Sequence, residues 1–222
     1  MKISRSAFLN RVLKSLAFKY TALGAAHYPY NVEPIQLAYL VRQIDRLRDV
    51  KGNIAEIGVA RGMTTRFLAE HIRSEKLDSG MRYFAIDTFT SFTNADLDYE
   101  VQQRGKRRKE LVGFNYFDYD AFKRQFAPFP FVEAIQSDCT LVNYKDLAPL
   151  KLVFLDVDLY LPTKKTLLLL LDSLVDGGVI AVDDVQDKMA YDGAHQAYME
   201  FVKERGLNPV LIGNKCGVYV KD

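Results

Sequence analysis

Four aspartates stand at the ends of two apolar segments of the sequence. Asp156 and Asp158 close the run KLVFLDVDLY, and Asp183 and Asp184 close the run GGVIAVDDV about one helix length later. Carboxylates that are crowded together raise one another's pKa and destabilise a fold unless a proton or a cation neutralises them. Because no paired histidines or cysteines accompany these oxygens, they favour Mg²⁺, Mn²⁺ or Ca²⁺ over zinc. The alternative is that they are solvated acids in loops.

A second candidate site lies at the turn after an earlier apolar segment. The run NIAEIGVARG contains Glu56, Gly58 and Gly62 in the spacing E-x-G-x-x-x-G. In open α/β sheets ligands bind beyond the carboxyl ends of the strands, where glycines allow close approach. The chain lacks G-x-G-x-x-G and G-x-x-x-x-G-K-[ST], so a ligand without a pyrophosphate fits better. Asp87, which ends RYFAID, is placed to accept both ribose hydroxyls of an adenosine, or alternatively to cap the next helix.

These residues require a sheet that brings the strand ends together. A helical lead-in at 33–49 precedes seven apolar runs, which we place at 53–59, 82–87, 131–138, 151–158, 178–184, 209–213 and 216–222. Runs that are apolar throughout are typical of parallel strands covered by helices on both faces. The last two runs are separated by Asn214 and Lys215, too few residues for a parallel crossover. We therefore predict an α/β fold with a seven-stranded, mostly parallel sheet and one antiparallel strand.

One internal segment does not fit this alternation. Residues from Ser91 to about Tyr119 are longer than a usual connection, so we predict a lid-like insertion at about 91–119. Its cations and aromatic rings suit stacking on a ligand or pairing with its charge. RNA binding is one interpretation and a solvated basic turn a simpler one. These residues are Arg104, Lys106, Arg107, Arg108, Lys109, Phe114, Tyr116, Phe117 and Tyr119.

Residues 1–32 are predicted to form a basic amphipathic helical extension to a main domain at 33–222. No acid precedes Glu33, whereas five cations do. We expect this helix to pack on the protein's own body or on a second subunit of a homo-oligomer, with weak contact to an anionic membrane surface as the alternative. The cations leave no apolar stretch long enough for a signal peptide or a membrane span. The apolar residues at helical spacing are Phe8, Leu9, Val12, Leu13, Leu16 and Tyr20.

Composition sets broad limits on the class of protein. With 222 residues the chain is long enough for one large domain, and its net charge of +2 gives no general argument for a nucleic-acid partner. Cys139 and Cys216 lie far apart without disulfide-framework or zinc-site spacing. We therefore expect a cytoplasmic protein whose partner is a small molecule or a glycan.

The sequence resembles the macrocin-type O-methyltransferases, which use S-adenosylmethionine and a divalent metal to methylate sugar hydroxyls in antibiotics. The resemblance spans about 33–205 and rests on IAEIGVARGMTTRFLAE, AIDTFTSF, FLDVDLYLPTKKTL, DGGVIAVDDV and DGAHQAYMEF. Family members commonly read close to L-D-G-D-L-Y-E-S-T, G-G-x-x-x-x-D-D-Y and G-C-R-Q-A-V in the last three. The resemblance implies a Rossmann-like class I methyltransferase fold.

The same resemblance implies roles for individual residues. It implies Mg²⁺ or Mn²⁺ bound by the first acid and the later pair, with the remaining acid as catalytic base. His195, which stands where the family usually has arginine, is a second candidate base. Val157, Leu161 and Pro162 also depart from the pattern around the acceptor pocket, which leaves the acceptor undefined. The implied metal ligands are Asp156, Asp183 and Asp184, the base is Asp158, and the cofactor contacts are Glu56, Gly58, Gly62, Asp87, Ser137 and Asp138.

Other classes of protein share parts of this pattern. Catechol and caffeoyl-CoA O-methyltransferases have a similar acid spacing, but typically place lysine where this chain has Leu159. Asp156-Val-Asp158 also matches the metal-binding D-x-D of glycosyltransferases or a phosphatase nucleophile. Neither of those classes explains E-x-G-x-x-x-G upstream. A non-catalytic scaffold held at a membrane by the cationic N-terminus is a further alternative.

Overall fold

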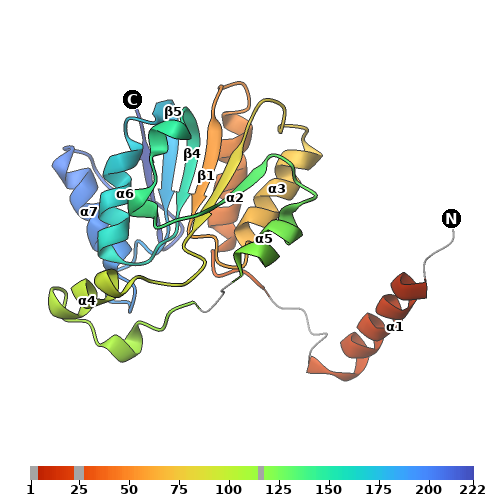
Figure 1. Cartoon of the computed structure of the whole chain (residues 1–222). Coiled ribbons are helices and arrows are strands. Elements are labelled where there is room, and N and C mark those ends of the chain that lie inside the picture. Colours follow the sequence, from red (N-terminus) through yellow and green to blue (C-terminus); the bar gives the residue numbers. More distant parts are fainter. Residues whose placement is uncertain (1–4, 23–27, 115–117) are drawn as a thin grey trace. The chain divides into compact units, whose positions relative to one another are not determined.

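The computed structural model describes residues 5–22, 28–114 and 118–222. Within them seven strands form one sheet in the order β3-β2-β1-β4-β5-β7-β6 (Figure 1). β1 to β5 pair in parallel, whereas β7 is antiparallel to both β5 and β6. The predicted sheet with one reversed strand is therefore confirmed. The strands are β1 (Asn53–Ile57), β2 (Tyr83–Asp87), β3 (Val132–Gln136), β4 (Leu150–Leu155), β5 (Leu174–Val182), β6 (Val210–Ile212) and β7 (Cys216–Val220).

Helices cover both faces of this sheet. α6 and α7 pack together on one face, and α2 and α3 pack together on the other (Figure 1). The helical lead-in is present as α2, which starts with a capping box between Glu33 and Gln36. Between β3 and β4 the short connection holds only two 3₁₀ turns. The helices of the main unit are α2 (Pro34–Arg46), α3 (Met63–Ser74), α4 (Asn94–Gln102), α5 (Tyr119–Phe126), α6 (Tyr160–Leu170) and α7 (Gly193–Glu204).

β1 is the strand at which the order of the sheet reverses. It pairs with β2 on one side and with β4 on the other. Connections that leave in opposite directions open a crevice beyond the carboxyl ends of these strands, which is the usual ligand site of such sheets. β4 is buried along its whole length. The site is therefore supported by the most enclosed part of the sheet.

The strands stop just before the aspartates. β4 ends at Leu155 and β5 ends at Val182, whereas the predicted runs extended to residues 158 and 184. The last residue of each predicted run, Asp158 (φ 61°) and Asp184 (φ 55°), adopts a left-handed conformation, so neither run can continue as a strand to its end. All four acids consequently lie in the loops that follow the carboxyl ends of β4 and β5.

The chain divides into two compact units, Met1–Asn31 and Val32–Asp222. The first contains α1 (Arg5–Tyr20), so the helix predicted there is present. Within this unit α1 leaves large apolar side chains exposed, among them Phe8, Leu9 and Leu13. In the described parts of the chain, no helix has the length and apolar character needed to cross a bilayer.

Candidate active site

The loop after β1 passes very close to the loop after β4. Gly58 has a φ of +86°, and a Cβ on it would overlap the carbonyl oxygen of Asp156. The Asp156 N–H donates to the carbonyl of Ile57 at 2.8 Å. Gly62 (φ +77°) is restricted from the other side, since a Cβ there would lie 2.6 Å from the ring of Phe126. Both glycines of the motif are therefore required by close packing.

Asp87 connects the ends of β1 and β2. Its Oδ2 accepts N–H groups from Val59 at 2.8 Å and Ala60 at 3.0 Å, and its Oδ1 accepts the N–H of Phe89 at 2.7 Å. These three bonds fix the loop that carries the glycines. The Thr88 hydroxyl also donates to Oδ1, at 3.4 Å, so donors within the protein already approach the about four acceptor positions of this carboxylate.

Ser137 and Asp138 follow β3, beside this loop. The Ser137 N–H donates to the Asp87 carbonyl at 2.9 Å, which joins the ends of β2 and β3. The Asp138 side chain caps the next 3₁₀ turn, since its Oδ1 accepts both the N–H and the hydroxyl of Thr140 at 2.8 Å. The structure thus brings Ser137 next to Asp87, while one carboxylate oxygen of Asp138 is used locally.

Glu56 lies beneath the loop rather than at its surface. Its side chain is 1% exposed, and its Oε2 accepts hydrogen bonds from the hydroxyls of Thr65 (2.6 Å) and Tyr83. Burial raises the pKa of Glu56 to about 7, although both hydroxyls oppose the shift. The two hydrogen bonds of this carboxylate therefore join β1, α3 and β2 inside the core.

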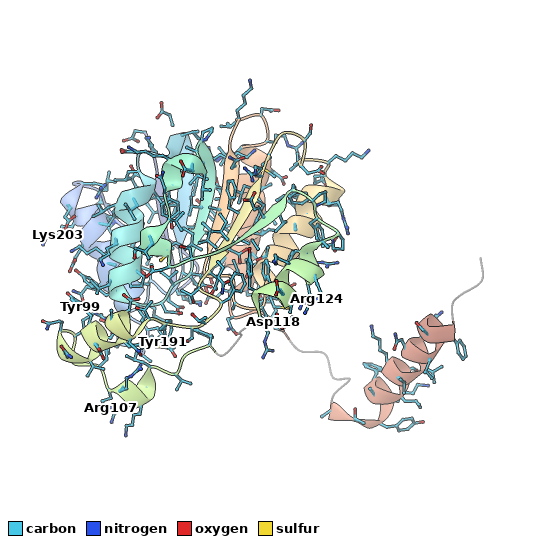
Figure 2. The ribbon with its side chains drawn as sticks, in the orientation of Figure 1. Tyr99, Arg107, Asp118, Arg124, Tyr191 and Lys203 are labelled. Carbon is cyan, nitrogen blue, oxygen red and sulfur yellow. The ribbon has the colours of Figure 1, made fainter. Side chains whose placement is uncertain are left out.

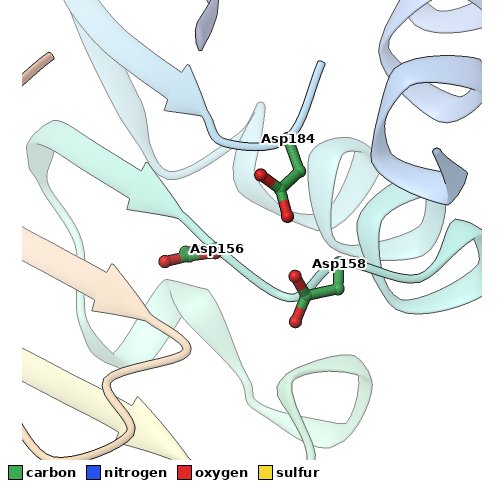
Figure 3. A group of neighbouring side chains, drawn as sticks. All are labelled: Asp156, Asp158 and Asp184. Carbon is green, nitrogen blue, oxygen red and sulfur yellow. The ribbon is translucent and has the colours of Figure 1, made fainter. Parts of the chain in front are cut away.

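Three of the four aspartates converge beyond the ends of β4 and β5 (Figure 3). Asp156, Asp158 and Asp184 each offer a carboxylate oxygen, and these oxygens lie within 4.8 Å of one another. Asp183 faces other partners. Its Oδ1 accepts from Gln36 Nε2 at 2.6 Å, and its Oδ2 accepts from Lys215 Nζ at 3.0 Å.

The electrostatics of this cluster favour a further cation. Burial, followed by the charge of Asp183, raises the pKa of Asp156 well above its ordinary value. Burial together with the Asp184 carboxylate does the same for Asp158, and burial also raises the pKa of Asp183. Lys215 supplies one positive charge against four carboxylates. An oxygen-only donor set with unbalanced negative charge fits a hard divalent cation such as Mg²⁺ or Mn²⁺.

Lys215 and Gln36 were not identified from the sequence. Lys215 Nζ also donates to Asp184 Oδ1 at 2.8 Å, and the charges of both aspartates raise the pKa of Lys215 although burial opposes this. The position of Lys215 follows from the antiparallel pairing of β5 with β7. Val182 pairs with Gly217, so continuing the register by two residues places residue 215 opposite Asp184. Gln36 on α2 is 147 positions from Asp183, and no local pattern indicated it.

An aromatic cluster lies close to the acids. Phe92 and Phe114 come from the insertion, and their ring centroids lie 5.9 and 6.3 Å from that of Tyr191 and 5.7 Å from each other. Tyr191 donates its hydroxyl to the Val112 carbonyl at 2.6 Å (Figure 2 labels its position). Phe92 and Tyr191 pack against the buried cluster that contains Leu159, the residue next to Asp158, and burial raises the pKa of Tyr191. We call Phe92, Phe114 and Tyr191 the aromatic wall.

The described part of the insertion is held to the main unit by ion pairs. Arg104 and Lys106 both reach Asp192 Oδ1, at 2.8 and 2.6 Å. Arg107, which Figure 2 labels, is paired within the insertion with Glu110. Tyr116 and Phe117, two of the aromatic residues expected to act in the insertion, lie outside the described residues. Three of the insertion's cations thus have acidic partners within the protein.

His195 lies apart from the carboxylates. It lines an open hollow of about 640 Å³ along α7, together with residues such as Asp192 and Glu200. None of the four aspartates lines this hollow. The structure therefore does not bring His195 into the carboxylate cluster.

The seven-stranded sheet, with its glycine turn at the topological switch point, has the Rossmann-like fold of class I methyltransferases. The model of the macrocin O-methyltransferase family, TylF, matches residues 35–221. The chain belongs to this family and is an O-methyltransferase. No curated protein sequence matches it.

Solved structures share the fold at low sequence identity. The calicheamicin methyltransferase CalS11 superposes with a TM-score of 0.68 at 15% identity, covering 99% of this chain and 94% of CalS11. The O-methyltransferase NovP gives 0.64 at 16% identity, covering 94% of this chain and 88% of NovP. An O-methyltransferase from Bacillus cereus in complex with SAH gives 0.52 at 17% identity, covering 97% and 90%.

Proposed function

We propose that this O-methyltransferase methylates a hydroxyl of a sugar or a glycosylated small molecule with the help of bound Mg²⁺ or Mn²⁺. The observation that carries the proposal is the contact of Gly58 with the backbone of Asp156. This contact sets the glycine turn, where S-adenosylmethionine is expected, directly beside the carboxylate cluster. Methyl donor and metal would therefore serve one acceptor hydroxyl.

Two observations support a sugar as the acceptor. The chain belongs to the macrocin O-methyltransferase family, and CalS11 is described as a TDP-rhamnose 3′-O-methyltransferase. The aromatic wall beside the acids offers an apolar surface for one face of a ring-shaped acceptor. Charged residues would then hold the hydroxyl side of the acceptor, and aromatic residues its C–H side.

For the metal we propose Asp156 and Asp184 as ligands, as the resemblance implies. A bound divalent cation supplies Lewis acidity, which lowers the pKa of an acceptor hydroxyl. Asp183 is the third proposed ligand. To bind the metal through Oδ2, it would have to give up the hydrogen bond from Lys215 Nζ. Titration of Asp183→Asn and Asp184→Asn with Mg²⁺ tests whether Asp183 is a ligand. If only Asp184→Asn loses much Mg²⁺ affinity, Asp183 is not a metal ligand.

We assign the role of general base to Asp158. Asp158 is buried and offers a carboxylate oxygen within 4.8 Å of those of Asp156 and Asp184, so a hydroxyl bound at this cluster would lie within its reach. His195 is the less suitable candidate, because it lines the hollow along α7. Asp158 would take the proton from the hydroxyl while the aromatic wall and the remaining acids hold the acceptor in line with the methyl group.

We keep the cofactor-binding residues proposed from the sequence. Some of them would contact the cofactor, and others would act by holding the loops around it. Gly58 and Gly62 allow the cofactor to approach the backbone, and Asp87 and Ser137 stand at the adjoining strand ends. Glu56 would act by fixing the loop from beneath through Thr65 and Tyr83. Asp138 would shape the adenine side of the site through the turn that it caps.

The experiment combines cofactor binding with turnover. Calorimetric titration with S-adenosylmethionine should show binding, and EDTA should abolish methyl transfer that Mg²⁺ then restores. Asp158→Asn should lower turnover by about 10²-fold or more and leave cofactor affinity nearly unchanged. Asp187→Asn, an exposed acid just beyond the cluster, is the matched control.

An acceptor panel decides the substrate class. Nucleotide sugars and glycosides should be methylated in preference to catechols. Preference for catechols would overturn the sugar assignment, and full turnover by Asp158→Asn would overturn the assignment of the base. Binding of a nucleotide sugar without binding of S-adenosylmethionine would contradict the proposed chemistry as a whole.

We further propose a cytoplasmic setting, which the two free, buried cysteines suit. The division 1–32 and 33–222, with 91–119 as a lid-like insertion, remains our proposal for the domains. For α1 we keep the expectation of packing on the main unit or on a second subunit. Light scattering of the full chain and of a chain lacking residues 1–22 tests the oligomer.

A further inference from the structure

Glu100 is a buried acid that the proposed chemistry does not use. It lies on α4 of the insertion and is 1% exposed. Its Oε1 accepts the N–H of Tyr160 at 2.7 Å, and its Oε2 forms an ion pair with Arg104. A buried carboxylate needs partners of this kind, so the position of Glu100 depends on both.

The bond to Tyr160 replaces a missing helix cap. Tyr160 is the first residue of α6, and the preceding N-cap residue, Leu159, makes no side-chain cap. The first N–H groups of a helix have no partners within the helix and favour a negative charge. Glu100 supplies such a partner from a distant segment, 60 positions earlier in the chain. The start of α6 is thus held by the insertion.

The start of α7 also packs against Glu100 and Tyr160. Asp192, its N-cap residue, forms ion pairs with Arg104 and Lys106 of the insertion. A Cβ on Gly193 would lie 2.8 Å from Glu100 Oε1 and would also overlap the Tyr160 nitrogen, so only glycine allows this approach. α4, α6 and α7 therefore converge on Glu100.

Asp158 stands directly beside this convergence. Its carbonyl oxygen accepts the N–H of Ala194, on α7, at 3.0 Å, and it lies two residues before Tyr160. Its φ of 61° is a conformation that residues other than glycine keep only where the surroundings hold it. The supports visible around it are the α7 amide and, through Tyr160, Glu100.

We propose that Glu100 is a positioning residue that holds the backbone of Asp158 through the N–H of Tyr160, so that docking of the insertion sets the direction of the proposed base. The catalytic part of this inference rests on the proposed function. The structural part does not, because it concerns the backbone from Asp158 to Tyr160 alone. The two parts are therefore measured separately.

The first readout is hydrogen exchange of the Tyr160 amide. Glu100→Leu removes the acceptor, so exchange at Tyr160 should become about 10-fold faster or more, while amides within β4 stay unchanged. Glu100→Gln retains an oxygen acceptor for the Tyr160 N–H but replaces the oxygen that pairs with Arg104 by an NH2 group, so it should restore part of the protection. Glu110→Gln, which breaks the Arg107 ion pair in the same insertion, is the matched control and should leave Tyr160 unchanged.

The second readout is turnover by the full chain with S-adenosylmethionine and Mg²⁺. Glu100→Leu should lower kcat by about 10-fold or more with cofactor affinity unchanged, because a displaced base loses alignment. Glu100→Gln should recover part of kcat, because it keeps the acceptor of the Tyr160 N–H but loses the Arg104 ion pair. Arg104→Met, which leaves the carboxylate but removes its ion pair, should change exchange and kcat in the same direction and serves if Glu100→Leu does not fold.

Unchanged exchange at Tyr160 in Glu100→Leu, or in Arg104→Met, would overturn the proposal. So would faster exchange with wild-type kcat, because the backbone would then be loosened without consequence for the base. If the wild-type protein transferred no methyl group to any acceptor, the proposed function would fail, and the exchange data would still decide whether Glu100 holds this backbone.

Discussion

Glu56 offers the sharpest test of how burial controls this site. Its carboxylate is almost fully buried, and burial raises its pKa from 4.5 to about 7. A carboxyl group whose pKa is raised in the folded state stabilises the protein fully below its unfolded pKa, and this contribution is lost as the pH rises through the folded pKa. The interval from 4.5 to about 7 corresponds to about 3 kcal/mol, at 1.36 kcal/mol per pKa unit.

Glu56→Gln imitates the protonated acid. Thr65 and Tyr83 both donate to one oxygen of Glu56, and the amide oxygen of glutamine can accept both bonds. The free energy of unfolding of the wild-type protein should therefore fall by about 2–3 kcal/mol more than that of the variant between pH 5 and pH 8.

The assay is urea unfolding at pH 5, 6, 7 and 8 in EDTA, followed by circular dichroism. Only the difference between wild type and Glu56→Gln is used, so the other acids cancel. Glu75→Gln, an exposed acid at the end of α3, is the control and should follow the wild-type curve. Parallel curves for wild type and Glu56→Gln would refute the reasoning, since they would mean that burial does not raise the pKa of Glu56.

Three further predictions concern the contact between loop and acids. Gly58→Ala should destabilise the protein by at least about 3 kcal/mol and abolish cofactor binding, because its Cβ would overlap the Asp156 carbonyl; a normal melting temperature would contradict this packing. Lys215→Met should lower the free energy of unfolding by about 3 kcal/mol in EDTA, because it leaves Asp183 and Asp184 without their cation. Mg²⁺ should therefore stabilise this variant more than the wild type. An equal effect of Mg²⁺ on the melting temperatures of the two proteins would contradict the prediction. Mg²⁺ should bind more tightly at pH 8 than at pH 6 and release protons, because the cluster carboxyls have raised pKa values and must ionise; calorimetry in two buffers measures this, and pH-independent affinity would count against it.

The docking of the insertion could not be read from its own sequence. Arg104 and Lys106 were recognised there as cations, but their partner Asp192 is 88 positions away from Arg104. Glu100 gave no signal, because a single glutamate on a short helix is ordinarily solvated. Only the packing of α4 against the starts of α6 and α7 makes it a buried partner.

The sequence by itself determined the sheet and the place of the site. Apolar runs of strand length, each followed by acids or glycines, are enough to predict parallel strands covered by helices on both faces, and the carboxyl ends of parallel strands lie on the same side of the sheet. The tertiary structure alone decided which acid faces which partner. Asp156, Asp158 and Asp184 converge while Asp183 turns to Gln36 and Lys215, since side-chain direction depends on left-handed backbone at the strand ends and on residues up to 147 positions away.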